Sequence, residues 1–316
     1  MIIDTNPEFG YEIACVIPYA YWLHEQGKLE KVITSKGMKP FYYFCNNVEE
    51  KYDYRTVDNG AAGLNDIPNN WIHHNAEAVF GKDYGELSEK QKEDANGVLD
   101  YSQWKLPPYK DYYKDDKFKF EKPMIVISNK IVMDHSKEPH AYFDLKTLYD
   151  MFNYLTENNY IVVYKRPKMK EFAIDQNEQS TLAGGYDIKA NVDGIGEIND
   201  HELTKYYDDV YLIDDIVKDN KNYNFNEVQL RVFANADGFI SIAGGNAIFC
   251  SCFGNKNITY VTTSGELREN YFQKNGYYCK LSGCDVIPIR DPEGDIIERG
   301  YNDYKSLIKK IKEIYN

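Results

Sequence analysis

The sequence has few cysteines, no excess of basic residues and no long apolar run, and each shortage excludes a class of protein. Six cysteines among 316 residues are too few for a disulfide-stabilised scaffold. No apolar stretch approaches the ~20 residues of a membrane-spanning helix. The 37 Lys and Arg against 50 Asp and Glu give a net charge of −13, which disfavours a nucleic-acid partner.

What is present indicates a folded protein with reduced thiols. Aromatic residues make up 15% of the chain, which argues against disorder. The first residues carry Asp4 and Glu8 in place of the basic segment of a secretion signal, so we expect a cytoplasmic location. At roughly 100–200 residues per domain, the length suits two domains better than one.

Short apolar runs alternate with helical patterns from residue 122 onward. Such alternation predicts a doubly wound parallel sheet with helices on both faces. Asp144 is the expected N-cap of the first of these helices. The predicted strands cover 124–128, 160–164, 210–213, 238–242, 258–261 and 286–289, and the predicted helices cover 145–158, 224–235, 247–253 and 303–315.

The first 120 residues follow a less regular pattern. A helix is predicted over 13–26, with strands over 32–35 and 41–44. The polar stretch 46–116 gives no clear pattern apart from a helix around 87–95, and residues 106–123 read as the connection between two domains.

Three loops at the carboxyl ends of predicted strands could bind a phosphate-bearing ligand, because ligands of open parallel sheets bind at that edge. The first loop contains Ser241 and then Gly244, Gly245 and Asn246, where the glycines let a ligand approach the backbone. The other two loops contribute Asn129 with Lys130 and Lys165 with Arg166, whose cations can neutralise a diphosphate. No P-loop lysine follows the glycines, which excludes a Walker-type nucleotide hydrolase.

Further candidates are single acids, bases and an ion pair. Glu227 and Arg231 share one helix face, as an exposed ion pair or with Glu227 as a ribose ligand. Glu8 and Glu12 flank the start of a helix, where either could be a general base or simply favour the helix dipole. His135, with His140 nearby, is a candidate base or phosphate contact in the loop after the strand 124–128.

The sequence gives little support for a metal site or for catalysis through a covalent intermediate. Cys250 and Cys252 fall in a short predicted helix where they point in different directions, and Cys279 and Cys284 have no second pair at zinc-site spacing. The sequence has no Gly-x-Ser-x-Gly motif and no Asp-x-Asp pair. We therefore expect no metal, and no hydrolase with a covalent intermediate.

Six short motifs follow one another along the chain. They are Gly10-Tyr-Glu12, Lys39-Pro-Phe-Tyr-Tyr-Phe44, Ile127-Ser-Asn-Lys130, Tyr164-Lys-Arg-Pro167, Asn226-Glu-Val-Gln-Leu-Arg231 and Ile240-Ser-Ile-Ala-Gly-Gly-Asn246. In this order the series resembles the GT-B glycosyltransferases encoded by chloroviruses and other giant viruses, with the xylosyltransferase branch the nearest. The similarity spans most of the chain and is strongest over 122–262.

The resemblance implies an α/β protein of GT-B fold, with two Rossmann-like domains facing across a cleft. Residues 1–121 would bind a glycan acceptor and residues 122–302 the nucleotide-sugar donor, while the helix over 303–316 would pack back onto the first domain. A UDP-sugar is the expected co-substrate, no metal or other cofactor is required, and the host cytoplasm is the expected location of a viral enzyme. The donor would be bound by Asn129, Lys130, Arg166, Glu227, Gly244, Gly245 and Asn246.

The sequence therefore predicts a glycosyltransferase that moves a pentose or hexose to a hydroxyl acceptor. Glu12, ahead of Glu8, is the expected general base, and a single displacement would invert the anomeric centre. A nucleotide-sugar epimerase on the same fold stays open as an alternative, and so does a non-catalytic module that binds a glycan or nucleotide. The sequence does not specify the oligomeric state.

Overall fold

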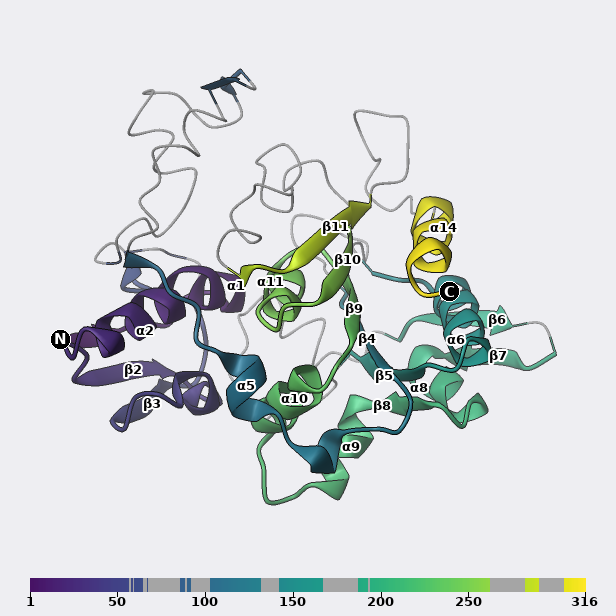
Figure 1. The fold of residues 1–316 in the computed structure, drawn as a ribbon, viewed down its shortest axis with the longest axis horizontal. Coiled ribbons are helices and arrows are strands. Elements are labelled where there is room, and N and C mark those ends of the chain that lie inside the picture. The colour runs from purple at the N-terminus through teal and green to yellow at the C-terminus, as the bar shows by residue number, and fades with distance from the viewer. Residues whose placement is uncertain are drawn as a thin grey trace.

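The computed structural model describes most of the chain as two parallel α/β units. The described residues are 1–56, 58, 60–64, 67, 86–88, 90–91, 103–131, 142–166, 187–192, 194–261, 282–289 and 304–316. We refer to residues 1–121 as the N-terminal half and to residues 122–316 as the C-terminal half; they lie side by side in Figure 1. Among the described residues, no helix has both the length and the apolarity to cross a bilayer.

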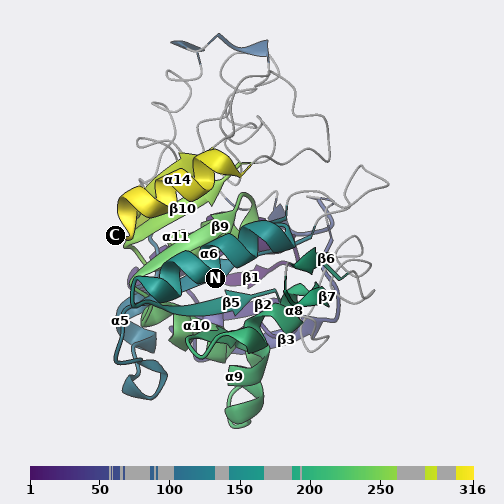
Figure 2. The ribbon, with the colours of Figure 1, turned by 90° about the vertical axis from the view of Figure 1, so that its right-hand side faces the viewer.

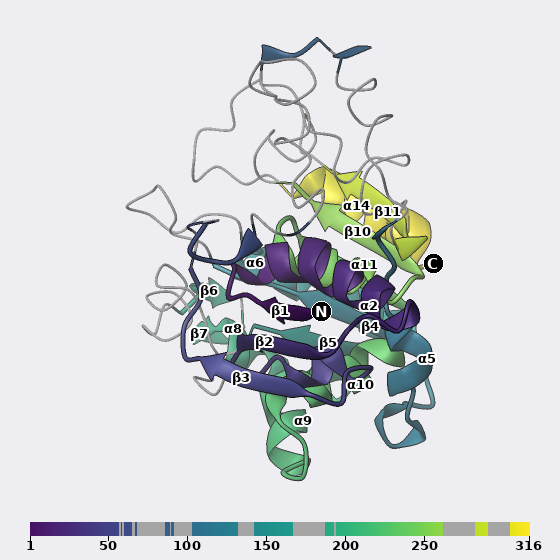
Figure 3. The ribbon, with the colours of Figure 1, turned by 90° about the vertical axis from the view of Figure 1, so that its left-hand side faces the viewer.

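The N-terminal half contains a three-stranded parallel sheet in the order β1-β2-β3 (Figure 3). A continuous helical segment joins the first two strands, and its middle turn is a π-helix. The elements are β1 (Ile2–Asp4), α1 (Phe9–Tyr11), the π-helix η1 (Glu12–Val16), α2 (Ile17–Glu25), β2 (Lys31–Ser35), the 3₁₀-helix η2 (Lys39–Tyr42) and β3 (Val48–Tyr52).

One predicted strand in this half is wrong. Residues 41–44 were expected to form a strand, but Phe41 and Tyr42 close a 3₁₀-helix that has Pro40 in its first turn. Pro40 has no backbone N–H for a strand ladder, and its fixed φ suits a helix start. The predicted helix around 87–95 lies largely outside the described residues.

The C-terminal half contains a six-stranded parallel sheet in the order β11-β10-β9-β4-β5-β8. The chain starts in the middle of this sheet, adds β5 and β8 on one side, and returns to add β9, β10 and β11 on the other. This doubly wound order confirms the predicted α/β class, and it places the switch in winding direction between β4 and β9. The strands are β4 (Met124–Ser128), β5 (Ile161–Lys165), β8 (Val210–Leu212), β9 (Gly238–Ile242), β10 (Lys256–Tyr260) and β11 (Asp285–Ile289).

Helices cover both faces of this sheet, as the alternating pattern predicted. Asp144 caps α6 through a 2.7 Å bond from the N–H of Thr147, which is the predicted cap. The helices α6 (Leu145–Glu157) and α14 (Lys305–Ile314) cover one face (Figure 2). The other face is covered by α9 (Ile213–Asp219), α10 (Phe225–Ala234) and α11 (Gly245–Ser251).

Smaller elements complete the described fold. A β-hairpin and a short helix follow β5 in the chain, and two short helices connect the halves. These elements are β6 (Lys189–Val192), β7 (Gly196–Asn199), α8 (Asp200–Leu203), the 3₁₀-helix η7 (Thr204–Tyr206), α5 (Tyr109–Tyr113) and the 3₁₀-helix η6 (Asp116–Phe118).

The last helix does not pack where the resemblance placed it. Leu307 and Ile311 of α14 are buried in the apolar cluster that includes α6 and β10, and Tyr315 packs against Tyr160. In Figures 1 and 2, α14 lies on the C-terminal half, far from the N-terminal sheet. The apolar face of α14 packs on the C-terminal half. The expectation that this helix packs onto the N-terminal half is therefore wrong.

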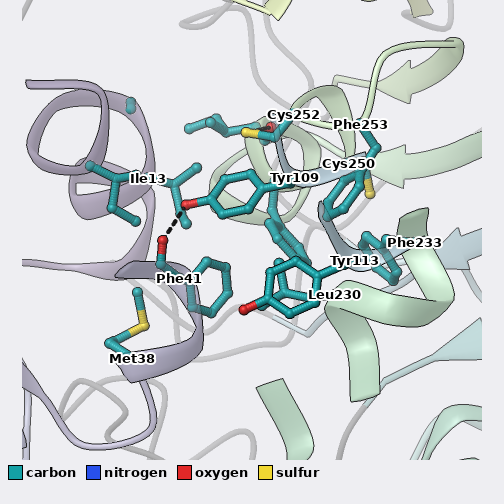
Figure 4. Close-up of a cluster of buried hydrophobic side chains, with 14 of the residues drawn as sticks. Ile13, Met38, Phe41, Tyr109, Tyr113, Leu230, Phe233, Cys250, Cys252 and Phe253 are labelled. Carbon is teal, nitrogen blue, oxygen red and sulfur yellow. Dashed lines mark hydrogen bonds between the residues drawn. The ribbon is translucent and has the colours of Figure 1, made fainter. Parts of the chain in front are cut away.

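A single aromatic core joins the two halves (Figure 4). Phe41 of η2 contacts Phe249 of α11 with ring centroids 5.3 Å apart. Tyr109 of α5 packs near Phe253 and donates a 2.9 Å hydrogen bond to the carbonyl of Phe41. Because side chains from both halves bury one another, neither half has a complete core without its partner.

We predict that the two halves unfold in one transition. All three tryptophans fall within residues 1–121, and Trp22 and Trp104 both pack against Tyr19 of α2, so tryptophan fluorescence reports on the N-terminal half, whereas far-UV circular dichroism reports on the whole chain. Urea titrations should give the same midpoint for both signals. Phe249→Ala in α11, at a cost of about 3–5 kcal/mol, should lower both midpoints together. Separate midpoints, or a change confined to the circular dichroism signal, would contradict a shared core.

Candidate functional site

The switch point between β4 and β9 brings two of the predicted loops together. Lys130 follows β4, and the segment Gly244-Gly245-Asn246 follows β9; these two strands are adjacent and parallel, so their carboxyl ends meet at one edge. An open α/β sheet binds ligands at this position, because the loops diverge there.

Lys130 lies against the backbone of Gly244. Gly244 has a φ of +108°, and a Cβ on it would lie 2.7 Å from the Nζ of Lys130. The positive φ therefore favours glycine here, whereas the ammonium is the flexible end of its side chain and has room to shift. Lys130 is half-buried, and no carboxylate of the described part of the chain forms an ion pair with it. A cation held beside a half-buried stretch of backbone is suited to an anionic ligand.

Lys165, the last residue of β5, contacts the same loop through Asn246. Its ammonium donates a 2.9 Å hydrogen bond to Oδ1 of Asn246 and lies 5.6 Å from the ring centroids of Phe233 and Phe249. Lys165 is only 4% exposed, so it acts on Asn246 more than on solvent. Since Oδ1 accepts from Lys165, the amide NH₂ of Asn246 points elsewhere and has no acceptor among the residues with described positions.

Arg166 is not brought to this loop. Successive residues of an extended strand point to opposite faces, so Arg166 lies on the face opposite Lys165. There its Nη2 donates a 2.5 Å bond to Oδ1 of Asp200, and its Nε bonds the other carboxylate oxygen. The hydroxyl of Tyr164 donates to the same carboxylate at 2.6 Å, and burial, followed by the negative charge of Asp200, raises the pKa of Tyr164 well above its usual value.

Asn129 orients the backbone instead of facing a ligand. Its Oδ1 accepts from the N–H groups of Phe143 and Lys130 at 2.8 and 2.9 Å, and its Nδ2 donates to the carbonyl of Phe143 and the hydroxyl of Tyr164. All of these partners are in the protein, and Asn129 is buried. Asn129 thus fixes the chain direction from which Lys130 emerges.

Ser241 holds α11 on the sheet. It is fully buried, and its hydroxyl donates a 2.8 Å bond to Asn257 on the neighbouring strand β10. Asn257 in turn donates a 3.0 Å bond to the carbonyl of Ala247 in α11. Ser241, which was predicted to contact the bound ligand, is therefore buried beneath the glycine loop and supports it through Asn257 and α11.

Glu227 and Arg231 form an ion pair that extends to a third residue. Arg231 lies 3.0 Å from Glu227 and 2.8 Å from Asp115, which caps η6 in the connection between the halves. The guanidinium also covers the ring of Tyr223 at 4.4 Å. This network joins α10 to the connecting segment. The sequence allowed an exposed ion pair on one helix face, whereas the pair observed is partly buried, with side chains 20% and 28% exposed.

The two candidate acids of the N-terminal half have different surroundings. Glu12 is fully buried, and its carboxylate accepts from Thr34, from Tyr42 at 2.8 Å and from Arg55 at 2.6 Å. Glu8 precedes α1 and is half-buried. His135 lies outside the described residues.

The start of α1 contacts the glycine loop directly. A Cβ on Gly245 would lie 3.2 Å from both N and Cα of Gly10, and 3.4 Å from the ring of Phe9. Because α1 follows β1 and Gly245 follows β9, the carboxyl ends of strands from both sheets meet at this contact. Glu8, two residues before Gly10, is therefore the candidate acid next to the loop.

Sequence reasoning missed two residues that shape this region. Arg55 lies in the polar stretch that gave no pattern, and nothing near it in sequence indicates a partner at Glu12. Asp200 follows Asn199, which forms a capping box with Glu202. The Asn-x-x-Glu spacing could have located the start of α8, although not the pairing with Arg166. No cluster of three or more metal-binding side chains occurs among the described residues.

The comparisons with known proteins give structural neighbours only. Neither a protein-family model nor a curated protein sequence matches the chain. Among solved structures, the chain is similar to the E. coli ADP-heptose LPS heptosyltransferase II, at 10% identity and a TM-score of 0.48, over 99% of this chain and 98% of that one. It is also similar to the E. coli heptosyltransferase WaaC with ADP, at 10% identity and a TM-score of 0.47, over 100% and 99% of the two chains.

We predict a loss of stability at alkaline pH from the buried tyrosines of these networks. Burial raises the pKa of Tyr164 and Tyr42 above the usual ~10, so each stabilises the fold fully below pH ~10 and ceases to do so as pH rises towards the folded-state pKa. Above pH ~10 each should contribute about −1.4 kcal/mol of unfolding free energy per pH unit. Urea unfolding at increasing pH measures this slope, and Tyr164→Phe should make it shallower. An unchanged slope in that variant would be inconsistent with a buried neutral phenol.

Proposed function

We propose that this protein is a glycosyltransferase that uses a nucleotide-diphosphate sugar as donor. The observation that carries the proposal is the position of Lys130 against Gly244 at the switch point of the six-stranded sheet. The amide NH₂ of Asn246 lies on the same loop, and the segment that contains Glu8 and Gly10 meets the loop from the other half. The proposal is thus supported by a cation and an amide of one half and by the approach of the acid-bearing segment of the other.

The chemistry follows from the charges. As the acceptor hydroxyl attacks the anomeric carbon, its oxygen forms the new glycosidic bond while the bond from that carbon to the diphosphate oxygen breaks. Lys130 and the Asn246 amide would stabilise the negative charge that develops on the departing diphosphate. A carboxylate of the N-terminal half would take the hydroxyl proton. One such displacement inverts the anomeric centre, and no step requires a metal.

The geometry changes which acid we propose for the proton transfer. The carboxylate of Glu12 already accepts three hydrogen bonds in a fully buried position. A general base must reach the proton that it removes, so we propose Glu8 in place of Glu12. Likewise, we propose that Lys130, Gly244, Gly245 and Asn246 contact the donor, and that Lys165, Asn129 and Ser241 position them.

The finer assignments rest on the sequence resemblance. The similarity to the GT-B enzymes of giant viruses favours a UDP-sugar as donor, a pentose or hexose as the transferred sugar and a glycan as acceptor. We propose residues 122–302 as the donor-binding domain, residues 1–121 as the acceptor-binding domain and the cytoplasm as the location. Product analysis separates a transferase from an epimerase, because an epimerase converts the donor without an acceptor.

Lys130→Ala is the test of the donor site. Loss of the ammonium should lower turnover by about 10²-fold, as for the loss of one transition-state stabiliser. It should also weaken binding of the nucleoside diphosphate by about tenfold, equal to 1.4 kcal/mol. Titration calorimetry with UDP, GDP and ADP and a transfer assay with the matching sugars measure both effects.

Lys218→Ala is the matched control. Lys218 is an exposed lysine on α9 that pairs with Asp215 in the same helix. This variant should keep the affinity and turnover of the wild type. Equal behaviour of the two variants would remove the assignment of Lys130, and a wild type that binds no nucleotide would refute the proposed function.

A further inference from the structure

Glu12 is a buried carboxylate whose donors come from three separate elements. Thr34 belongs to β2, Tyr42 to η2, and Arg55 follows β3, so the carboxylate connects β2, η2 and the segment after β3. Glu12 also begins the π-helical turn η1, a rare geometry that is frequent at functional sites. An acid that only favours the dipole at a helix start needs no such set of three buried donors.

Arg55 connects Glu12 to the segment that contacts the glycine loop. It is 3% exposed, and its Nη1 bonds both Glu12, at 2.6 Å, and the carbonyl of Pro7, at 2.7 Å. Its guanidinium also lies 5.6 Å from the ring centroid of Phe9. Arg55 thereby contacts the segment on either side of Glu8, at Pro7 and at Phe9.

Phe9 and Gly10 in turn contact the C-terminal half. The Phe9 ring packs edge-on against Phe249 of α11 at 5.9 Å, and it also approaches Gly245. Gly10 meets Gly245 backbone to backbone, and a Cβ on either residue would lie only 3.2–3.3 Å from the other backbone, which would have to move to admit it. A continuous series of contacts therefore runs from Glu12 through Arg55 and Phe9 to the loop that holds Asn246.

We infer that Arg55 is a positioning residue of this site. Together with Glu12, it holds the Pro7–Gly10 segment at a fixed separation from the Gly244-Gly245-Asn246 loop, so that the acid of one half faces the donor bound by the other. This role rests on the proposed function. A buried ion pair contributes little net stability compared with apolar packing, but its geometry is specific, which suits positioning. The planar guanidinium can bond Glu12 and Pro7 while it covers Phe9, which a lysine ammonium cannot reproduce.

The test compares Arg55→Lys with the wild type in two assays. In the transfer assay, kcat should fall by about 10²-fold, the effect of an ~1 Å misplacement, while KM for the donor and the dissociation constant of the nucleoside diphosphate stay within about twofold. In amide hydrogen exchange, the peptide over 244–251 should exchange faster, while the peptides of β4 and β5 keep their wild-type rates.

Two further variants keep the test decisive. Leu148→Ala creates a cavity beneath α6, on the opposite face of the sheet. It should lower the melting temperature. Exchange at 244–251 and kcat below the melting temperature should stay unchanged. Phe9→Leu leaves the Glu12–Arg55 pair intact but removes the connecting ring, and it should reproduce both effects of Arg55→Lys. It also replaces Arg55→Lys if that variant does not fold.

The outcomes separate this inference from the proposed function. Unchanged exchange at 244–251 in both Arg55→Lys and Phe9→Leu would overturn the positioning role, and so would a parallel loss of kcat and nucleotide affinity. If the wild type transfers no sugar, the proposed function fails, yet the exchange experiment still decides whether Arg55 controls the loop.

Discussion

The contact between Gly10 and Gly245 sets the relation of the two halves. Two residues without side chains let α1 and α11 approach backbone to backbone, because a Cβ on either would press on the other chain at 3.2–3.3 Å. Around this contact the aromatic rings of both halves close into one core, with Phe9, Phe41 and Phe249 in mutual contact. The carboxyl end of β1 is thereby placed at the carboxyl end of β9, and the candidate site is formed where both sheets present their loops.

Charge is distributed around this site in two ways. Two ion pairs of the described residues are buried, Glu12 with Arg55 in one half and Asp200 with Arg166 in the other, while the buried ammonium of Lys165 bonds the amide oxygen of Asn246. Half-buried Lys130 has no carboxylate partner in the described part of the chain. A buried charge is tolerated only with its partner in place, so the paired groups hold the backbone, whereas the half-buried Lys130 fits the role in donor binding proposed above.

Much of the fold could be predicted from the sequence, because apolar runs mark buried strands. The strands β4 and β9 were predicted with their observed bounds, and the cap of α6 was predicted from Asp144. The edge strand β3 was missed because its residues Val48–Tyr52 are mostly charged, as is common for exposed edges. The run 41–44 was misread as a strand because a short apolar run looks the same whether it packs as a strand or as a helical turn.

The candidate site was predicted in part, for a similar reason. Lys130 and the glycine loop follow predicted strands, and their meeting follows from the order of strands in the sheet. The separation of Lys165 from Arg166 could have been read from strand alternation, which places neighbours on opposite faces. The ion pair of Glu12 with Arg55 could not be predicted from the sequence, because Arg55 lies 43 positions away and only the folded sheet brings the two together.

The shared aromatic core also limits how such a protein can change during evolution. Where two domains meet through a polar, hydrated surface, recombination can exchange one of them and produce a chimera that still folds. Here Phe41 and Tyr109 would have to find a new fit with the rings of a foreign α11. New ligand preferences would therefore arise through point substitutions in the loops, with both halves inherited as one unit.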